Sequence, residues 1–131
     1  MKDVMELAKD LGEGIRKDPV LLAYDEAKAA FDADTELSAQ MTEYNAQRTC
    51  LTEEFNKDLD EQDKAVIEQL RGRMDALAAE INRNGNYTRY ASAQKAVSEL
   101  MQRINEEITY YAFGVRPQHC NHDCAGCSGC H

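Results

Sequence analysis

The sequence predicts an all-α fold: an elongated antiparallel helical bundle of about five helices with long coiled-coil-like seams, followed by an irregular cysteine-rich tail. Proline occurs only at Pro19 and Pro117, and the chain is rich in Ala, Glu, Gln, Lys, Leu and Met, which favour helix. Apolar residues recur three and four positions apart over long stretches, the spacing of a helix face. Four of the five cysteines gather after residue 119, where no large apolar residue accompanies them.

The first two helices are expected at about 2–16 and 19–33. Asp18 can cap the second helix, and Pro19 suits the first helical position because no backbone donor is needed there. The first helix carries an apolar face of Val4, Leu7, Ala8, Leu11 and Ile15. The second is expected to bury Val20, Tyr24, Ala27 and Phe31.

A third helix is expected from the break at residues 32–35 to about 57. Its apolar seam consists of Leu37, Met41, Tyr44, Leu51 and Phe55. Arg48 occupies a position that the pattern would give to an apolar residue, so it either snorkels at the edge of the seam or makes a polar contact that fixes register or partner choice. Cys50 has no other ligand type nearby, so we expect it to be a small packing residue.

The fourth helix is expected to begin at a cap on Asp60 and to reach about residue 83. Its predicted buried stripe is Val66, Leu70, Met74, Leu77 and Ile81. The sequence Asn84-Gly85-Asn86 predicts a short turn, with Gly85 in a left-handed position and Asn86 as the next cap. Such a turn would pair the fourth and fifth helices as an antiparallel hairpin.

The fifth helix, about 87–113, has the clearest periodicity. Its 3-4 repeat consists of Tyr87, Tyr90, Gln94, Val97, Met101, Ile104, Ile108 and Tyr111. A repeat of this length is typical of helices that pack side by side at a shallow angle, and we expect its tyrosines to be core residues. Gly114 and Pro117 end the helix, so we divide the chain into a helical domain, 1–114, and a Cys/His-rich tail, 115–131.

Charge and motifs narrow the classes of function. The formal charge of −9 lies in the body of the chain and repels phosphate and anionic lipid, which disfavours direct nucleic-acid binding. The N-terminus lacks a secretory pattern and no apolar run could cross a membrane, so we expect a cytoplasmic protein without membrane insertion. No phosphate loop or nucleophile motif occurs, and no histidine precedes His119, so we expect no enzymatic activity.

The tail reads as a set of metal ligands. Its cysteines, spaced C-x3-C-x2-C-x2-C, are Cys120, Cys124, Cys127 and Cys130. Thiolates suit iron–sulfur clusters, zinc or copper(I), and the dense run favours a cluster because structural zinc usually takes two pairs divided by a longer loop. A single zinc ion stays open as the alternative, as do disulfide chemistry and a tail without function. Possible substitute ligands are His119, His122 and His131.

The whole chain resembles the YlbF/YmcA family of small helical bacterial regulators. The resemblance lies in the Asp18-Pro19 helix start, the long charged middle helices and the Asn84-Gly85-Asn86 turn. It extends to Tyr24, Phe31, Tyr90, Leu100, Ile104 and Ile108. A cysteine-rich tail after such a body is similar to the YlbF branch.

The resemblance implies a non-enzymatic adaptor that forms homo-oligomers or joins related regulators in a complex carrying 4Fe–4S clusters. It further implies a role in mRNA processing through ribonuclease Y, and in competence, sporulation and biofilm formation. The four tail cysteines would then be cluster ligands. A helical module that binds or delivers zinc, and a plain coiled-coil spacer, are the rival interpretations.

Overall fold

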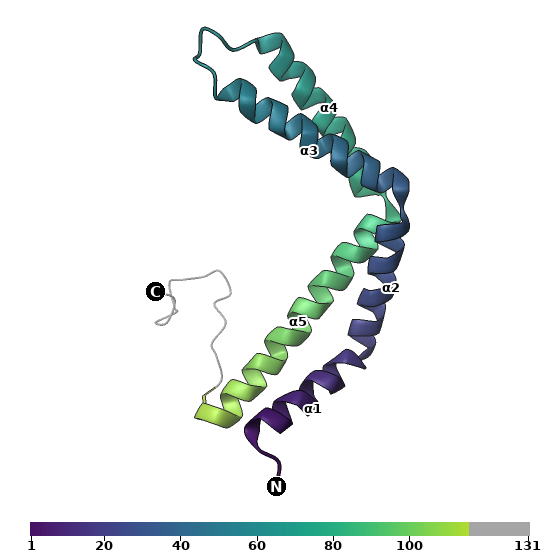
Figure 1. Cartoon of the computed structure of the whole chain (residues 1–131), viewed down its shortest axis with the longest axis vertical. Coiled ribbons are helices and arrows are strands. Elements are labelled where there is room, and N and C mark those ends of the chain that lie inside the picture. The colour runs from purple at the N-terminus through teal and green to yellow at the C-terminus, as the bar shows by residue number, and fades with distance from the viewer. Residues whose placement is uncertain (116–131) are drawn as a thin grey trace. The chain divides into compact units, whose positions relative to one another are not determined.

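The computed structural model describes residues 1–115, which form five α-helices and, within that range, no strand. They are α1 (Val4–Arg16), α2 (Pro19–Ala33), α3 (Thr35–Phe55), α4 (Lys64–Arg83) and α5 (Gly85–Phe113) (Figure 1). The predicted all-α class and number of helices are confirmed. The chain forms two compact units, residues 1–94 and the part from residue 95 onward, so α5 begins in the first and continues in the second.

The helix starts follow local capping chemistry. Asp3 and Glu6 form a capping box at the start of α1, in which each side chain accepts the other residue's backbone N–H. Asp18 accepts the N–H of Val20 at 2.9 Å, and Pro19 opens α2 as predicted. Gly114, at φ 77°, follows the end of α5, where a residue without Cβ adopts this conformation at little cost.

The most extensive helix packing in the described chain joins α3 to α4, which run side by side as a hairpin connected by residues 56–63 (Figure 1). The predicted hairpin of α4 with α5 is therefore wrong: the principal partner of α4 is α3. The core of this hairpin consists of Leu37, Ile67, Leu77 and Ile81. Leu37 and Leu77 are fully buried, at 0% exposure.

The buried stripes differ from the predicted seams at particular positions. In α3, Phe55 is 43% exposed while the preceding residue, Glu54, is buried. Gln40 and Gln47 are half-buried, and together with Leu37, Tyr44, Leu51 and Glu54 they complete a 3-4 repeat that hydropathy alone does not reveal. In α4, Ile67 is buried and Val66 is exposed. Arg48 and Cys50 are exposed, so the predicted packing role of Cys50 is wrong.

The connection between α3 and α4 is held by one carboxylate. Glu54 accepts the backbone N–H of Asp63 at 2.7 Å and the ammonium group of Lys57 at 2.8 Å. Its charge is thereby paired, which offsets the cost of burying it. Asp63 in turn caps α4 by accepting the N–H groups of Ala65 and Val66, so the predicted cap at Asp60 is wrong.

The break between α4 and α5 is shorter than predicted. Asn84 is the single residue between the helices, and its side-chain oxygen accepts the N–H groups of Asn86 and Tyr87. Gly85 is already the first residue of α5 and has no positive φ, so its predicted left-handed role and the predicted cap at Asn86 are both wrong.

In the first unit, the early turns of α5 pack on α2 through aromatic rings. The rings of Phe31 and Tyr90 stack at 4.6 Å between centroids, and the Tyr24 and Tyr90 hydroxyls lie 3.4 Å apart. That hydroxyl contact, with desolvation, raises the pKa of Tyr90, because the neutral phenol is the favoured form there. Ala27 is buried beneath the same face of α2. Of the residues expected to be buried in α2, only Ala27 is buried, whereas Val20, Tyr24 and Phe31 are half-buried, as is Tyr90 of α5.

Candidate functional site

The predicted metal ligands lie outside the described residues. This applies to His119, Cys120, His122, Cys124, Cys127, Cys130 and His131. Within residues 1–115, no group of three or more His, Cys, Asp or Glu side chains is arranged to hold a metal ion. The candidate sites that the described chain offers are therefore surfaces and pockets.

On one face of the α3–α4 hairpin, polar side chains form hydrogen bonds between the two helices. The guanidinium of Arg73 donates two hydrogen bonds to the Glu43 carboxylate, at 2.6 and 2.8 Å, and these bonds hold the pKa of Glu43 below its ordinary value. The Gln40 amide donates to Glu80 at 3.0 Å. These pairs link the two helices to each other, although the Oε1 atom of Gln40 is buried without a hydrogen-bond partner.

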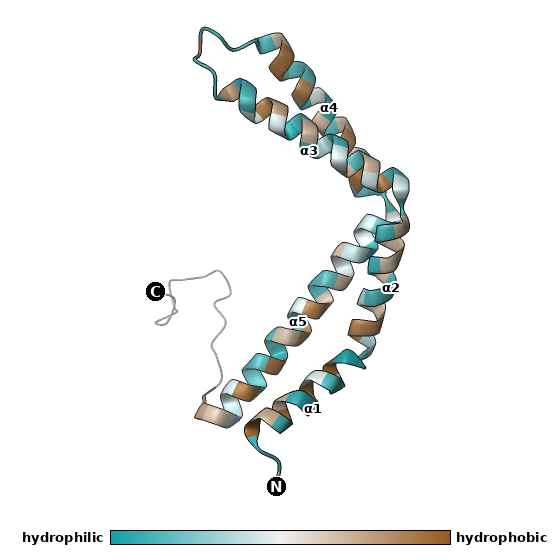
Figure 2. Cartoon of the chain, in the orientation of Figure 1, coloured by the Kyte–Doolittle hydropathy of each residue, from teal (hydrophilic) through white to brown (hydrophobic). Residues whose placement is uncertain are grey.

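The surface of α1 is different, because none of its residues is buried. Of the apolar residues that the sequence predicts on one face, Val4, Leu7 and Leu11 are exposed, at 79, 55 and 41%. Met5, which lies beside this face, is 76% exposed. Hydrophobic and hydrophilic positions alternate along this helix in Figure 2. A helix that is strongly amphipathic and yet uncovered in the single chain indicates a surface for association.

The part of α5 in the second unit repeats this pattern. The sequence predicts a core seam, but Met101 and Ile108 are exposed and Tyr111 is 80% exposed. The expectation that all the seam tyrosines are core residues is thus wrong for Tyr111. A shallow groove of about 540 Å³ runs along this part of the helix. Its lining combines the apolar Val97 and Met101 with polar and charged residues, namely Ser98, Gln102, Asn105, Glu106 and Thr109.

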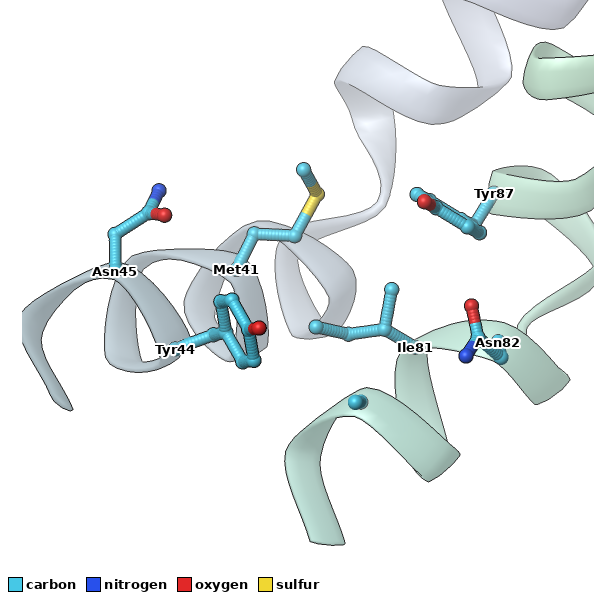
Figure 3. Close-up of a pocket in the computed structure, with 7 residues that line it drawn as sticks. Met41, Tyr44, Asn45, Ile81, Asn82 and Tyr87 are labelled. Carbon is cyan, nitrogen blue, oxygen red and sulfur yellow. The ribbon is translucent and has the colours of Figure 1, made fainter. Parts of the chain in front are cut away.

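A better-defined pocket lies in the first unit, beside the end of the α3–α4 hairpin. It has a volume of about 340 Å³, and Figure 3 shows Met41 and Tyr44 of α3, Ile81 of α4 and Tyr87 of α5 around it. Asn45 and Asn82 supply polar groups at its edge. Among the lining residues the only titratable groups are phenols, so the pocket holds no carboxylate or imidazole for proton transfer at neutral pH. Its lining suits apolar packing better than catalysis.

One polar cluster was not anticipated as a unit. The sequence predicts a cap near Asp34 and a turn at residues 84–86, but these positions are fifty residues apart and nothing in the spacing joins them. In the structure, both Asn84 and Asn86 donate a side-chain hydrogen bond to Asp34, each at 3.0 Å. The cluster holds no nucleophile or general base beyond this one carboxylate, which is fully engaged in hydrogen bonds.

None of the described helices is sufficiently long and apolar to cross a membrane. Comparison with known protein families matches the chain to a family described as "Control of competence regulator ComK, YlbF/YmcA", over residues 4–111. The matched range covers nearly all of the five helices and stops before the cysteines of the tail. No curated protein and no solved structure matches the chain.

Proposed function

The chain belongs to the YlbF/YmcA family, whose description is the control of a competence regulator, and we propose that it acts as a non-enzymatic cytoplasmic adaptor within that regulation. It would assemble with copies of itself or with related regulators, without direct nucleic-acid contact or membrane insertion. The observation that carries this proposal is the uncovered apolar surface of α1 and α5, in a chain whose α3–α4 hairpin covers its own core.

The exposed apolar residues of α1 can contribute to association. Covering a large apolar side chain contributes about 1.5–3 kcal/mol, so Val4, Leu7 and Leu11 together can offset several kcal/mol of the cost of ordering two chains. The same side chains gain nothing while they face water. We therefore expect purified protein to be oligomeric, and light scattering at several protein concentrations measures this directly. A monomer at every concentration would contradict self-assembly and leave association with a different subunit as the role of the surface.

We propose an iron–sulfur cluster, of the 4Fe–4S type, as the cofactor of the tail. The donor set fits this group, because Cys120, Cys124, Cys127 and Cys130 supply four thiolates in one short run. Such a cluster would supply one-electron redox chemistry and sensitivity to oxygen. The tail itself lacks apolar residues large enough to form a core, so ligation would provide the free energy that orders it.

The cofactor is tested by purification without oxygen, followed by analysis of iron, acid-labile sulfide and zinc. We expect iron and sulfide in comparable amounts, together with a brown colour. A variant with all four tail cysteines changed to serine is the matched control and should lose both. Stoichiometric zinc without labile sulfide would overturn the cluster and support the second candidate.

That second candidate is a module that binds or delivers zinc. The three histidines that lie among or beside the tail cysteines favour it, because imidazole is a common zinc ligand, and His119, His122 and His131 could complete a tetrahedral site. A colourless protein that exchanges zinc rapidly with a chelator would support this function. Retention of iron and sulfide in a variant with these three histidines changed to alanine would contradict it.

We propose the cellular process in which the chain acts from its family resemblance. The adaptor would modulate mRNA processing through ribonuclease Y, and thereby competence, sporulation and biofilm formation. The test compares transcript ends and competence in a strain with the native chain and in one with the serine tail. Unchanged transcripts in a strain that lacks the whole chain would exclude the link to ribonuclease Y. Changed transcripts in that strain but not in the serine strain would assign the effect to the helices alone.

A further inference from the structure

Two helix breaks of the same form meet in the first unit. Asp34 is the only residue between α2 and α3, and Asn84 is the only residue between α4 and α5. Each has extended backbone, with ψ of 94° and 123°, and each ends one helix and caps the next. The N–H of Asp34 is donated to the Phe31 carbonyl at 3.2 Å, and that of Asn84 to the Ile81 carbonyl at 3.0 Å.

One carboxylate joins the two breaks. Oδ1 of Asp34 accepts the N–H of Leu37 at 3.0 Å and so caps α3. Oδ2 accepts the side-chain amides of Asn84 and Asn86, each at 3.0 Å. The Asn84 oxygen meanwhile caps α5. Two helix N-termini therefore converge on a single anion, which is the charge that both helix dipoles favour.

The helices on either side of the Asp34–Asn84 contact form two bodies, and each body is held together by contacts of its own. On one side, α3 and α4 are held together by buried leucine and isoleucine and by the Arg73–Glu43 pair. On the other, the stack of Phe31 on Tyr90 joins α2 to the first turns of α5. Only two backbone residues lie between these two bodies, so a rotation of one body against the other needs changes at those two positions alone.

Open space surrounds the link. The pocket of about 340 Å³ is lined by Tyr87, which follows the Asn84 break, and by Met41 of the hairpin (Figure 3). A second pocket, of about 230 Å³, is lined by Phe31, which precedes the Asp34 break, and also by Met41. A third, of about 300 Å³, includes Asn84 itself. The first two volumes are bordered by residues from both bodies, whereas the third is bordered by the hairpin and Asn84. Packing beside the breaks therefore does not fix one arrangement.

We propose that Asp34 and Asn84 form a single joint, about which the α3–α4 hairpin turns as a rigid body against α2 and the first turns of α5. Asp34 is the positioning residue that holds one arrangement. Because both breaks share its carboxylate, a change of angle at the α2–α3 break is coupled to a change at the α4–α5 break. A partner that binds one arrangement of the joint more tightly would shift the conformational population at both breaks together. This inference goes beyond the proposed adaptor function and does not depend on the cofactor of the tail.

The test measures distances across the joint in the full chain. Spin labels on a ketone-bearing amino acid at positions 22 and 59 leave the five cysteines untouched, and both leucines there are exposed, at 52 and 88%. A second label pair, at positions 59 and 75, lies within the hairpin and its connecting loop and serves as the internal reference. Dilution with unlabelled protein removes distances between subunits. The readout is the width of each distance distribution by pulsed electron paramagnetic resonance.

Two variants break the link and keep the caps. In Asp34→Asn, one oxygen can still accept from Leu37, but the new amino group faces the amide donors of Asn84 and Asn86. In Asn84→Asp, an oxygen still caps α5, but two carboxylates oppose each other. Asp and Asn cap helices about equally well, so both variants should fold. The matched control is Asp18→Asn, because the Asp18 side chain caps α2 locally by accepting the N–H of Val20.

We expect both joint variants to widen the distribution between positions 22 and 59 roughly twofold or more, with no change between positions 59 and 75. Asp18→Asn should change neither. An unchanged width across the joint in both variants would overturn the proposal. Equal widening within the hairpin would overturn it as well, because the hairpin would then be melting instead of turning.

Discussion

The α3–α4 hairpin and the helix α1 both carry apolar residues along one face, but these residues are buried in the hairpin and exposed in α1. The hairpin brings Leu37, Ile67, Leu77 and Ile81 out of water, whereas α1 buries none of its residues. Burial within the chain stabilises the fold, while an exposed apolar face stabilises nothing until another surface covers it. The comparison teaches that the chain keeps one part for its own stability and another for association.

The largest effect should come from the hairpin core. Leu77→Ala removes a side chain that is fully buried and leaves a cavity, which should lower the free energy of unfolding by about 3 kcal/mol, within a range of about 2–5. Val66→Ala is the control, because Val66 lies on the same helix beside the core stripe but is 37% exposed, and it should cost less than about 1 kcal/mol. Urea unfolding followed by circular dichroism measures both. Equal losses would mean that the hairpin is not the stability core.

The next effect should come from α1 and should appear in association instead of folding. Leu7→Glu places a charge in the exposed apolar face and should weaken assembly about tenfold or more, since one unpaired charge in an apolar contact costs over 1.4 kcal/mol. The unfolding free energy of the single chain should change by less than about 0.5 kcal/mol. Sedimentation velocity over a range of concentrations measures the change.

Lys9→Glu is the control for α1, because position 9 lies on the other side of the helix from position 7 and the variant introduces the same residue. It should leave assembly nearly unchanged. If Leu7→Glu and Lys9→Glu weaken assembly equally, net charge and not the apolar face governs association.

A smaller effect on stability should depend on pH, because three carboxyl groups of the described residues have a lower pKa in the folded chain than their ordinary values. The pKa of Asp34 is lowered chiefly by the Leu37 N–H, that of Glu43 by Arg73 and that of Glu54 by Lys57. A lowered folded pKa means that the stabilisation is present above the ordinary values of 3.8 and 4.5 and is lost as pH falls through the folded values. The urea midpoint should therefore decline as pH drops below about 4.5.

Glu54→Gln sharpens this pH prediction. The variant should lower the urea midpoint at neutral pH, because Gln cannot pair with Lys57, and it should flatten part of the decline in acid. Glu53→Gln, at the exposed neighbouring position, should do neither. A decline in acid that is identical in native protein and Glu54→Gln would show that this carboxylate does not contribute to it.

Much of this architecture follows from sequence patterns, and the misses share a cause. The helices, the Asp18-Pro19 start and the closing Gly114 were predicted because their signals are local. The predicted seam of α3 lies partly on the wrong residues because hydropathy favours Phe55, while Glu54 is buried and bonded to Lys57 and Asp63 of the following loop. A polar residue that is buried through hydrogen bonds and ion pairing carries no apolar signal.

The candidate sites, too, can be predicted from the sequence only in part. The apolar residues of α1 and α5 can be listed from the sequence, but periodicity cannot distinguish a face that packs within the chain from one that stays uncovered. The link of Asp34 to Asn84 and Asn86 depends on two breaks meeting in space, which no local pattern encodes. The proposed ligands of the tail rest on spacing alone and stay a prediction.

The smallest effect should come from the ion pairs on the helix surfaces, which test whether charge holds α5 together where apolar burial does not. The Lys95 and Glu99 charges are 4.0 Å apart and their side chains are 80 and 62% exposed, so water screens most of their attraction. Lys95→Gln should therefore cost at most about 0.5 kcal/mol, and added salt should reduce even this difference. A larger loss would require a second partner for Lys95, supplied by an assembled neighbour, and the loss should then disappear on dilution to the monomer.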